Sequence, residues 1–434
     1  MLEQLLACLA GVITGYVVGL MPGIGVTVMM ILLFGLLTKI PILLLLIFYT
    51  CCVSACQFGG SVTALSTGLP GETNSFPLLK IRNVVVNNGQ QSDALFLCAA
   101  GHLIGAISTF ALSIFIIDII SSHTDYLKTA ALLIFSLTGL LMCVLFSESR
   151  WYFVIPSIVS AWFLSRIGTN FHTGEQFMTF DNVWISGGLP VISVVLGMYA
   201  MPTILKSLNQ PMLASDTRFN YAQAGRLELI TSNAAPIARG SVIGYLAGLI
   251  PYVGVDLSSY LAYYSEKLLK RDHMAQIAAA ETATNAAGIA MLLPLLIFGI
   301  AVQPSQNLLL EITNSVSYVL NWTSVKPMFM IVAAWLVIAN FFSFFLSWNL
   351  ARPVIDNLSK LGKAVPWLLC LLCVYSVYSI GVEYNQGVYY LIVMAVFSAI
   401  GWIFRKEDTL PFIFVFMLQD KLEPAIMRLY TLYS

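Results

Sequence analysis

The chain has 434 residues, of which 59% are hydrophobic and only 10% are charged, and its formal net charge is zero. Soluble domains carry roughly 25% charged residues, so this chain has too few polar side chains to cover a surface in water, and the lipid bilayer must be its main solvent. The charge balance excludes nucleic acid as a partner, because there is no basic excess to neutralise phosphates.

Apolar stretches recur from one end of the chain to the other. A membrane-spanning helix needs about 20 residues, so the sequence predicts an all-α, polytopic membrane protein of roughly a dozen spans. We expect them at residues 4–20, 26–38, 41–57, 94–119, 127–147, 151–166, 183–205, 237–251, 274–300, 327–349, 365–381, 387–404 and 409–418. Segments 58–71, 254–266 and 305–320 are more polar or shorter, which favours partial or re-entrant helices.

The first unusual segment, GLMPGIGVT at residues 19–27, interrupts an apolar run. Glycine and proline are poor helix formers, and a helix broken in lipid exposes backbone groups that protein or a water-filled cavity must cover. The break creates a helix N-terminus that attracts anions, and Thr27 adds a hydroxyl. We therefore predict a solute site at Pro22, Gly23, Gly25 and Thr27. Close helix packing is the alternative, and it is the interpretation we favour for Gly11, Gly15 and Gly19.

A second polar segment, SACQFGGSVTALSTGLPGETNSFP, begins at Ser54. Ser54, Gln57 and Ser61 are three to four residues apart and share one face of a helix. The pairs Gly59–Gly60 and Pro70–Gly71 predict an irregular stretch between them. The segment is typical of a wet cavity that binds solute through Gly59, Gly60, Ser61, Thr63, Pro70 and Gly71. The alternative is hydrogen bonding between packed helices.

The hydrophilic stretch 206–239 divides the chain into two predicted halves, residues 1–205 and 240–434. GVITGYVVGLMPGIGV begins at Gly11, and GSVIGYLAGLIPYVGV begins at Gly240, an offset of 229 residues (240 − 11 = 229). Four glycines, a proline and a tyrosine match at this offset, which indicates an internal repeat. Paired interruptions in two halves of a membrane protein are typical of a secondary transporter's binding site. The second break adds Pro251, Tyr252 and Gly254 to the predicted solute site.

The second half also contains AAAETATNAAGIA, in which Glu281 and Asn285 lie four residues apart on one helix face. Carboxylate, amide and hydroxyl oxygens are hard ligands that suit a small cation, so we predict cation coupling at Glu281 and Thr284, with Asn285 in the solute site. A glutamate at a loop edge is the alternative. Asp256, in the second break, is a further cation-coupling candidate. His102 lies between two glycines and has a proton to offer, although a lone histidine more often packs through a hydrogen bond.

Catalytic signatures are missing from the sequence. There is no HExxH, no GxSxG and no helical pair of carboxylates. We therefore expect no enzyme activity, no catalytic residue and no cofactor, with sodium or a proton as the only coupling ion. Two breaks and two polar segments that meet near the bilayer midplane would form one solute site.

These motifs resemble, in order and over nearly the whole chain, the large membrane subunit of the tripartite tricarboxylate transporters, the TctA-type permease. The resemblance is carried by GLMPGIGVT, FGGSVTALSTGLPG, RGSVIGYLAGLIPYVG and ETATNAAGIAMLLPLLIFGI. It implies cation-coupled uptake of a small organic anion, a carboxylate, across the bacterial inner membrane. It also implies two partners, a small membrane subunit of about four helices and a periplasmic solute-binding protein.

The sequence departs from the family pattern in its second half. Tyr252 stands where glycine is usual, Asp256 replaces a neutral residue, and Ala301 and Val302 replace Pro-Gly. In the first half, Glu72 stands where threonine is usual. A tricarboxylate solute therefore does not follow from the resemblance. A degenerate or regulatory homologue that binds partners without transport is the alternative function.

Overall fold

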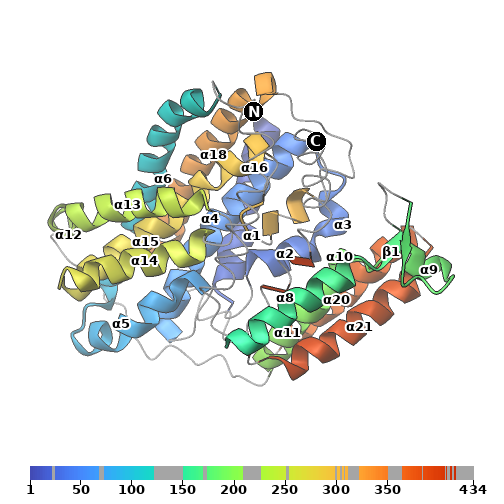
Figure 1. Ribbon diagram of the computed structural model, residues 1–434. Coiled ribbons are helices and arrows are strands. Elements are labelled where there is room, and N and C mark those ends of the chain that lie inside the picture. Colours follow the sequence, from blue (N-terminus) through green and yellow to red (C-terminus); the bar gives the residue numbers. More distant parts are fainter. Residues whose placement is uncertain are drawn as a thin grey trace, which may run out of the picture.

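We describe a computed structural model of the chain that covers residues 1–21, 25–67, 73–121, 150–169, 174–208, 226–250, 254–298, 301–303, 305–306, 308–310, 322–349, 364–383, 385–405, 407, 411–412 and 415–416. Nearly all of these residues are helical, and the short pair of strands β1 (Gly168–Thr169) and β2 (Gln176–Phe177) is antiparallel (Figure 1). The predicted all-α class is therefore confirmed for the described part of the chain.

The helices follow one another along the chain with short connections. The first half contains α1 (Leu2–Gly19), α2 (Val26–Leu32), α3 (Phe34–Leu37), α4 (Ile42–Thr67), a 3₁₀ turn at Thr73–Ser75, α5 (Phe76–Asn87), α6 (Gln91–Ser121), α8 (Trp151–Ser165), α9 (Val183–Ser186), α10 (Val191–Val195), a π-helical turn at Leu196–Ala200 and α11 (Met201–Leu208). The second half contains α12 (Arg226–Ser232), α13 (Ala234–Gly248), α14 (Gly254–Leu268), α15 (His273–Ala290), α16 (Leu292–Phe298), α18 (Trp322–Asn349), α20 (Ala364–Glu383) and α21 (Gly387–Ile403).

Five helical stretches of the described residues are long and apolar enough to cross a membrane. They are Leu2–Gly19, Ile42–Ser66, Gln91–Ile117, His273–Ile297 and Lys326–Ser347. Shorter apolar helices occur at Trp151–Ser165 and Gly387–Ile403. The span predicted at 127–147 lies outside the described residues, as do most residues of the span predicted at 409–418, so the total of a dozen stays a prediction.

Two predicted segments differ from the structure. Residues 59–67 continue helix α4 without a break, so the irregular stretch expected after Gly59–Gly60 was wrong. The reason is packing: an added Cβ at Gly59 would lie 2.5 Å from the carbonyl oxygen of Tyr16, so glycine serves close helix approach there. The single span expected at 183–205 is instead divided, because Gly188 has a positive φ of 82° and Pro190 follows it.

Both predicted interruptions are present. Helix α1 ends at Gly19 and α2 begins at Val26, whereas α13 ends at Gly248 and α14 begins at Gly254. Pro22, Gly23, Pro251 and Tyr252, which lie within the interruptions, are outside the described residues.

The glycine-rich helices on the N-terminal side of each interruption pack in the same way. Glycines Gly11, Gly15 and Gly19 of α1 lie directly on the backbone of α4 at Phe48, Cys52 and Cys56. Glycines Gly240, Gly244 and Gly248 of α13 lie directly on the backbone of α15 at Ala279, Ala283 and Ala287. Small residues at every fourth position allow the two backbones to touch.

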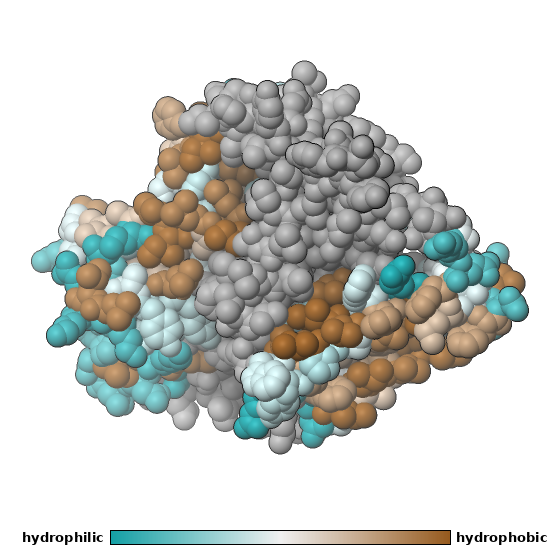
Figure 2. Space-filling model, viewed as in Figure 1, coloured by the Kyte–Doolittle hydropathy of each residue, from teal (hydrophilic) through white to brown (hydrophobic). Residues whose placement is uncertain are grey.

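Helices α4 and α15 form the centre of the larger group of helices, and α6 and α18 pack against both of them and against each other (Figure 1). A second group contains α8, α10, α11, α20 and α21, and it contacts the first group through α2 and α3, which pack on α20. Figure 2 shows mostly hydrophobic residues along the visible face of this second group, with hydrophilic residues at the end near the strands and α9. An apolar surface of this kind suits lipid contact.

Candidate functional site

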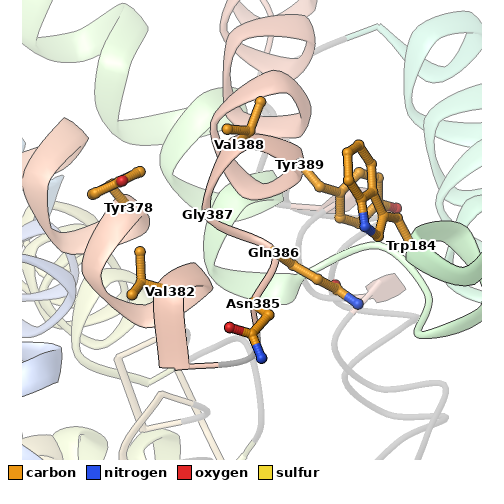
Figure 3. A pocket seen from close by; sticks show the side chains of 8 residues that line it. All are labelled: Trp184, Tyr378, Val382, Asn385, Gln386, Gly387, Val388 and Tyr389. Atoms are coloured by element: carbon orange, nitrogen blue, oxygen red, sulfur yellow. The ribbon is translucent and has the colours of Figure 1, made fainter.

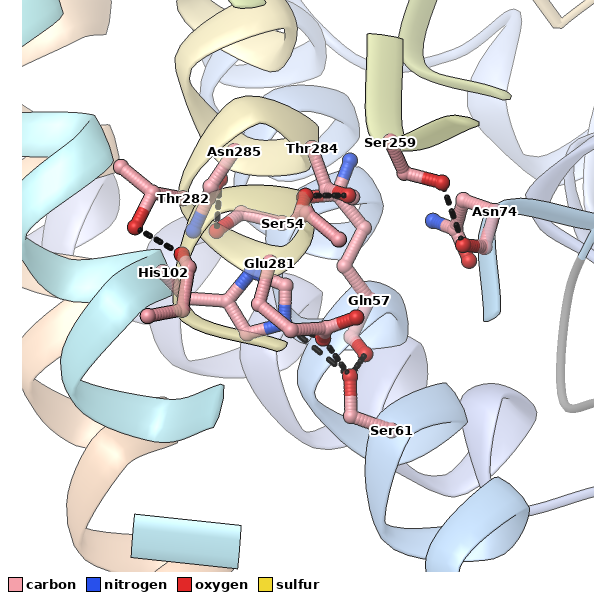
Figure 4. Close-up of polar contacts among 12 residues, drawn as sticks. Ser54, Gln57, Ser61, Asn74, His102, Ser259, Glu281, Thr282, Thr284 and Asn285 are labelled. Atoms are coloured by element: carbon pink, nitrogen blue, oxygen red, sulfur yellow. Dashed lines mark hydrogen bonds and ion pairs between the residues drawn. The ribbon is translucent and has the colours of Figure 1, made fainter. Parts of the chain in front are cut away.

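Polar side chains from four helices meet inside the apolar core (Figure 4). They are Ser54, Gln57 and Ser61 of α4, His102 of α6, Glu281 and Asn285 of α15, and Asn340 of α18, and each is at most 3% exposed. We call these seven residues the polar centre. Buried polar groups in lipid-embedded helices are expensive and usually functional.

Small residues bring α6 onto α15 at the polar centre. An added Cβ at Gly105 would lie 2.4 Å from the carbonyl oxygen of Thr282, and one at Gly101 would lie 2.9 Å from its hydroxyl. His102 lies between these two glycines. The close approach of the backbones therefore explains why its ring reaches the carboxylate of Glu281.

Glu281, His102 and Ser61 form one compact trio. Glu281 Oε2 lies 2.9 Å from His102 Nε2 and accepts a hydrogen bond from the Ser61 hydroxyl. Ser61 Oγ also lies 3.1 Å from His102 Nε2. The ring of Phe58 tilts against the imidazole, with 4.7 Å between ring centroids, which shields the trio on one side.

Asn285 links α15 to two further helices. Its Oδ1 accepts a hydrogen bond of 3.2 Å from the Ser54 hydroxyl, and its Nδ2 donates to Asn340 Oδ1. Asn340 in turn donates to the carbonyl oxygen of Leu336 over 2.8 Å. The chain of bonds fixes the orientation of both amides and holds α4, α15 and α18 together.

Two side chains of the polar centre have unused hydrogen-bonding capacity. Neither Nε2 nor Oε1 of Gln57 has a hydrogen-bond partner among the described residues, and the same is true of His102 Nδ1. The Gln57 amide lies above Gly288, with Nε2 3.6 Å from the position of an added Cβ there. A buried amide without partners costs about 1–3 kcal/mol, so the arrangement suits a group that binds a ligand.

The polar centre brings together three of the predicted site residues, Ser61, Glu281 and Asn285. Two others instead bond to the backbone: the Thr63 hydroxyl donates to the carbonyl oxygen of Gly19 over 3.4 Å, and the Thr284 hydroxyl donates to that of Ala280 over 2.9 Å. The remaining predicted residues are located elsewhere or are not described. Gly59 and Gly60 lie inside α4, Gly25 and Thr27 lie at the start of α2, Gly254 begins α14, and the structure does not describe Pro22, Gly23, Pro70, Gly71, Pro251, Tyr252 or the side chain of Asp256.

Sequence reasoning underrated three members of the polar centre. His102 was expected to pack rather than to pair, because its carboxylate partner lies 179 residues away along the chain (281 − 102 = 179). Gln57 was placed on the polar face of its helix but not in the site. Asn340 was not considered, although a single amide within a long apolar run is a signal of interhelical bonding.

Other charged groups of the described residues lie apart from the polar centre. Arg239 of α13 makes a bidentate ion pair with Glu266 of α14, with N–O distances of 2.6 and 2.7 Å. Arg82 of α5 donates to the carbonyl oxygens of Leu65 and Ser66 at the C-terminal end of α4, both over 3.1 Å. These contacts fix helix ends and explain how α5 and α14 are anchored.

A hollow of about 230 Å³ lies at the turn between α20 and α21, far along the chain from the polar centre (Figure 3). Trp184 of α9 and Tyr378, Asn385, Gln386 and Tyr389 of the α20–α21 turn line it, together with small apolar groups. The Tyr389 hydroxyl donates to the carbonyl oxygen of Gly188 over 3.1 Å. The hollow therefore lies where α9 is fastened to α21, and it contains no ionisable acid or base among its lining residues other than tyrosine.

The fold and the polar centre define a multi-pass helical membrane protein with a buried site made by helices from both ends of the chain. Residues 5–415 match the model of the family described as "Tripartite tricarboxylate transporter TctA family". Because the match covers most of the sequence, the chain belongs to the TctA family, as the sequence motifs predicted. It is thereby placed with transporters rather than with enzymes.

A curated relative supports the assignment. The chain is 28% identical over 311 residues to an uncharacterised 52.8 kDa protein of Agrobacterium vitis, described as lying in the TAR-I ttuC' 3' region. The match covers 68% of this chain and 61% of that protein, so the chain spans less than two thirds of the length of this relative. No solved structure matches the chain.

Proposed function

We propose that the chain is the permease subunit of a tripartite system and carries out cation-coupled uptake of a small organic anion, a carboxylate, across the bacterial inner membrane. A small membrane subunit of about four helices and a periplasmic solute-binding protein would complete the system. Membership of the TctA family supports the tripartite assembly, and the polar centre supplies the binding groups.

The observation that carries this proposal is the relation between Ser54 and Asn285. They are 231 residues apart, and the packing contacts of α1 on α4 and of α13 on α15 repeat with the same offset, as from Phe48 to Ala279 (279 − 48 = 231). We infer that α4 and α15 are equivalent helices of an internal repeat. Equivalent residues bond to each other when they lie on the symmetry axis, so Ser54 and Asn285 mark the axis. Transporters with repeats hold their solute at such an interface.

The same register extends to α6 and α18. Shifting α6 by 231 residues makes it begin at residue 322, where α18 begins (91 + 231 = 322). The contacts are crossed in the way that a two-fold axis requires, because α4 packs on α18 while α15 packs on α6. The polar centre is thus formed by both halves jointly. A solute bound there would be reached from either side if the group containing α20 and α21 moved against the group containing α4 and α15.

Uptake measurements test this function. The chain would be reconstituted in liposomes with the small membrane subunit and the binding protein of its own system. Radiolabelled acetate, succinate and citrate would then be offered with an inward gradient of protons or of sodium. We expect at least one carboxylate to accumulate under one gradient. If none is taken up with both partners present, the alternative of a degenerate homologue that binds partners without transport is favoured, as the departures at Tyr252, Asp256, Ala301 and Val302 would then explain.

A further inference from the structure

The described residues contain two salt bridges, and they differ in kind. Arg239 and Glu266 are held by two short N–O contacts, and arginine does not lose its proton in proteins. His102 and Glu281 share one contact of 2.9 Å, and both side chains are at most 2% exposed. Histidine and glutamate both exchange protons in the accessible pH range, so this pair has a variable charge deep in the core.

The variable charge of this pair is not compensated by its surroundings. The groups that face it, or that carry charge on helices packed around it, are few in the described residues. They are Cys98 of α6, which lies near Glu281; Ser61 of α4; the mutually paired Arg239 and Glu266 of α13 and α14; and Arg82 of α5, which binds carbonyl oxygens. No free cation among them faces Glu281.

Charge counting then connects the pair to proton binding. With one exchangeable proton, the pair is neutral in sum, whether as imidazolium and carboxylate or as imidazole and carboxylic acid. Without that proton its net charge is −1, and an uncompensated charge in a dry core is strongly unfavourable. His102 Nδ1, which is buried and has no hydrogen-bond partner among the described residues, is the second nitrogen of the ring and has room in its bonding for the transferred proton.

A sodium ion fits this pair less well. A hard cation needs several oxygen ligands around it. Glu281 Oε2 already accepts from Ser61 and lies 2.9 Å from a ring nitrogen, and when the carboxylate is ionised this nitrogen points an N–H at it. The N–H dipole would repel a cation in the same position.

We propose that Ser61, His102 and Glu281 form the proton site that couples solute movement to the proton gradient, with a solute carboxylate held one helical turn away by Gln57. The proposal rests on the proposed function, since it names the coupling ion of that transporter. Gln57 precedes Ser61 by four residues on α4, and both ends of its amide are unpaired, so its N–H groups are available to a carboxylate.

Coupling follows from electrostatics. A carboxylate at Gln57 is repelled when the trio has a net charge of −1, and it is not repelled once one proton has bound to the pair. Proton and solute therefore bind with positive cooperativity, and each raises the affinity for the other by the same factor. One proton is taken up and one is released for each cycle of the site, and no other reactant is required.

The first test needs no solute. The infrared spectrum of the chain in lipid nanodiscs would be recorded across about pH 5 to 8, in sodium and in potassium chloride, for the natural chain and for Glu281→Gln. We expect the carboxyl bands that vanish in Glu281→Gln to change with pH, or imidazole bands that vanish in His102→Gln to do so, equally in both salts. A pair whose bands respond to sodium but not to pH would overturn the proposal.

The second test separates coupling from binding. It uses the reconstituted complex and whichever of acetate, succinate and citrate the natural chain transports. Glu281→Gln and His102→Gln should lower uptake driven by a proton gradient by about tenfold or more, while exchange of labelled for unlabelled solute continues. The matched control is Glu266→Gln, which removes the other buried glutamate of an ion pair and should affect exchange and gradient-driven uptake equally.

Three results contradict the proton site. Gradient-driven uptake in Glu281→Gln equal to that of the natural chain would do so, as would equal loss of exchange and of net uptake in both variants. Uptake that follows the sodium gradient alone would also overturn it. Failure of the natural chain to move any carboxylate would instead defeat the proposed function, and the infrared titration would still decide whether the pair binds a proton.

Discussion

The amide pair of Asn285 and Asn340 shows how single residues specify the core. In lipid, apolar contact does not favour one helix neighbour over another, so polar bonds between helices decide register. Asn285 bonds to Ser54 on one side and to Asn340 on the other. The three side chains are thus matched across α4, α15 and α18, and removing one of them leaves a buried donor or acceptor without a partner.

We predict that Asn340→Leu lowers the free energy of unfolding by about 1 kcal/mol, because Asn285 Nδ2 loses its acceptor in a dry environment. Ser343→Ala is the matched control on the same helix. The hydroxyl of Ser343 is buried and has no hydrogen-bond partner among the described residues, so its removal should leave stability unchanged. Thermal unfolding in detergent, followed by tryptophan fluorescence, compares the two variants. Equal stability of Asn340→Leu and the natural chain would refute the role of the pair.

A tyrosine at the outer end of α14 gives a prediction in the alkaline range. The Lys80 ammonium donates to the Tyr264 hydroxyl over 3.0 Å, and this hydrogen bond, with the charge of Lys80, lowers the pKa of Tyr264 below 10.0. The folded state then binds fewer protons than the unfolded state just below pH 10, so stability rises with pH there. Lys80→Met should raise the pKa of Tyr264, which ultraviolet absorbance of the phenolate measures. Lys267→Met is the control, because its charge is the weaker influence. An unchanged titration in Lys80→Met would contradict the contact.

At the scale of elements, the chain repeats one packing device, a glycine-lined helix laid on the central helix of its half. An added Cβ at Gly15 would lie 2.1 Å from the carbonyl oxygen of Cys52, and one at Gly244 would lie 2.2 Å from that of Ala283. Neither backbone atom can move without separating two helices. The glycine pattern in the sequence thus corresponds to direct backbone contact between α1 and α4 and between α13 and α15.

Gly15→Ala and Gly244→Ala should each destabilise the protein by about 1–3 kcal/mol, the usual effect of overpacking a dense core. Gly187→Ala is the control, since its φ is −75° and the nearest atom to an added Cβ is 3.8 Å away. Unfolding of the three variants in denaturant provides the comparison. If Gly15→Ala and Gly187→Ala unfold alike, the helices are not held as closely as the structure shows.

The sequence predicted the elements better than the site. The interruption after Gly19 and that after Gly248 follow from local glycine and proline patterns, which act within a few residues. The continuous helix through Gly59 and Gly60 could not be predicted, because the backbone of α1 stabilises it from another part of the chain. The pairing of His102 with Glu281 is likewise a tertiary contact, and a lone histidine in one sequence gives no indication of which carboxylate it meets.

At the scale of the whole molecule, the polar centre lies where the two halves cross. The helices α4 and α18, and equally α15 and α6, belong to opposite halves and pack together there. The second group, with α20 and α21, contacts α2 and α3, the short helices that follow the first interruption. A movement between the groups would therefore act on the segment that the sequence singled out first.

The most direct measurement is carboxylate-dependent stabilisation of the purified chain. Acetate, succinate and citrate would be tested at about pH 6 and about pH 8, in sodium and in potassium chloride, for the natural chain and for Gln57→Leu. A ligand at about 100 times its Kd stabilises the native state by about 2.7 kcal/mol. The account predicts that a carboxylate raises Tm more at the lower pH, equally in both salts, and that Gln57→Leu folds but loses the response. A response that survives in Gln57→Leu, or that requires sodium and ignores pH, would contradict it.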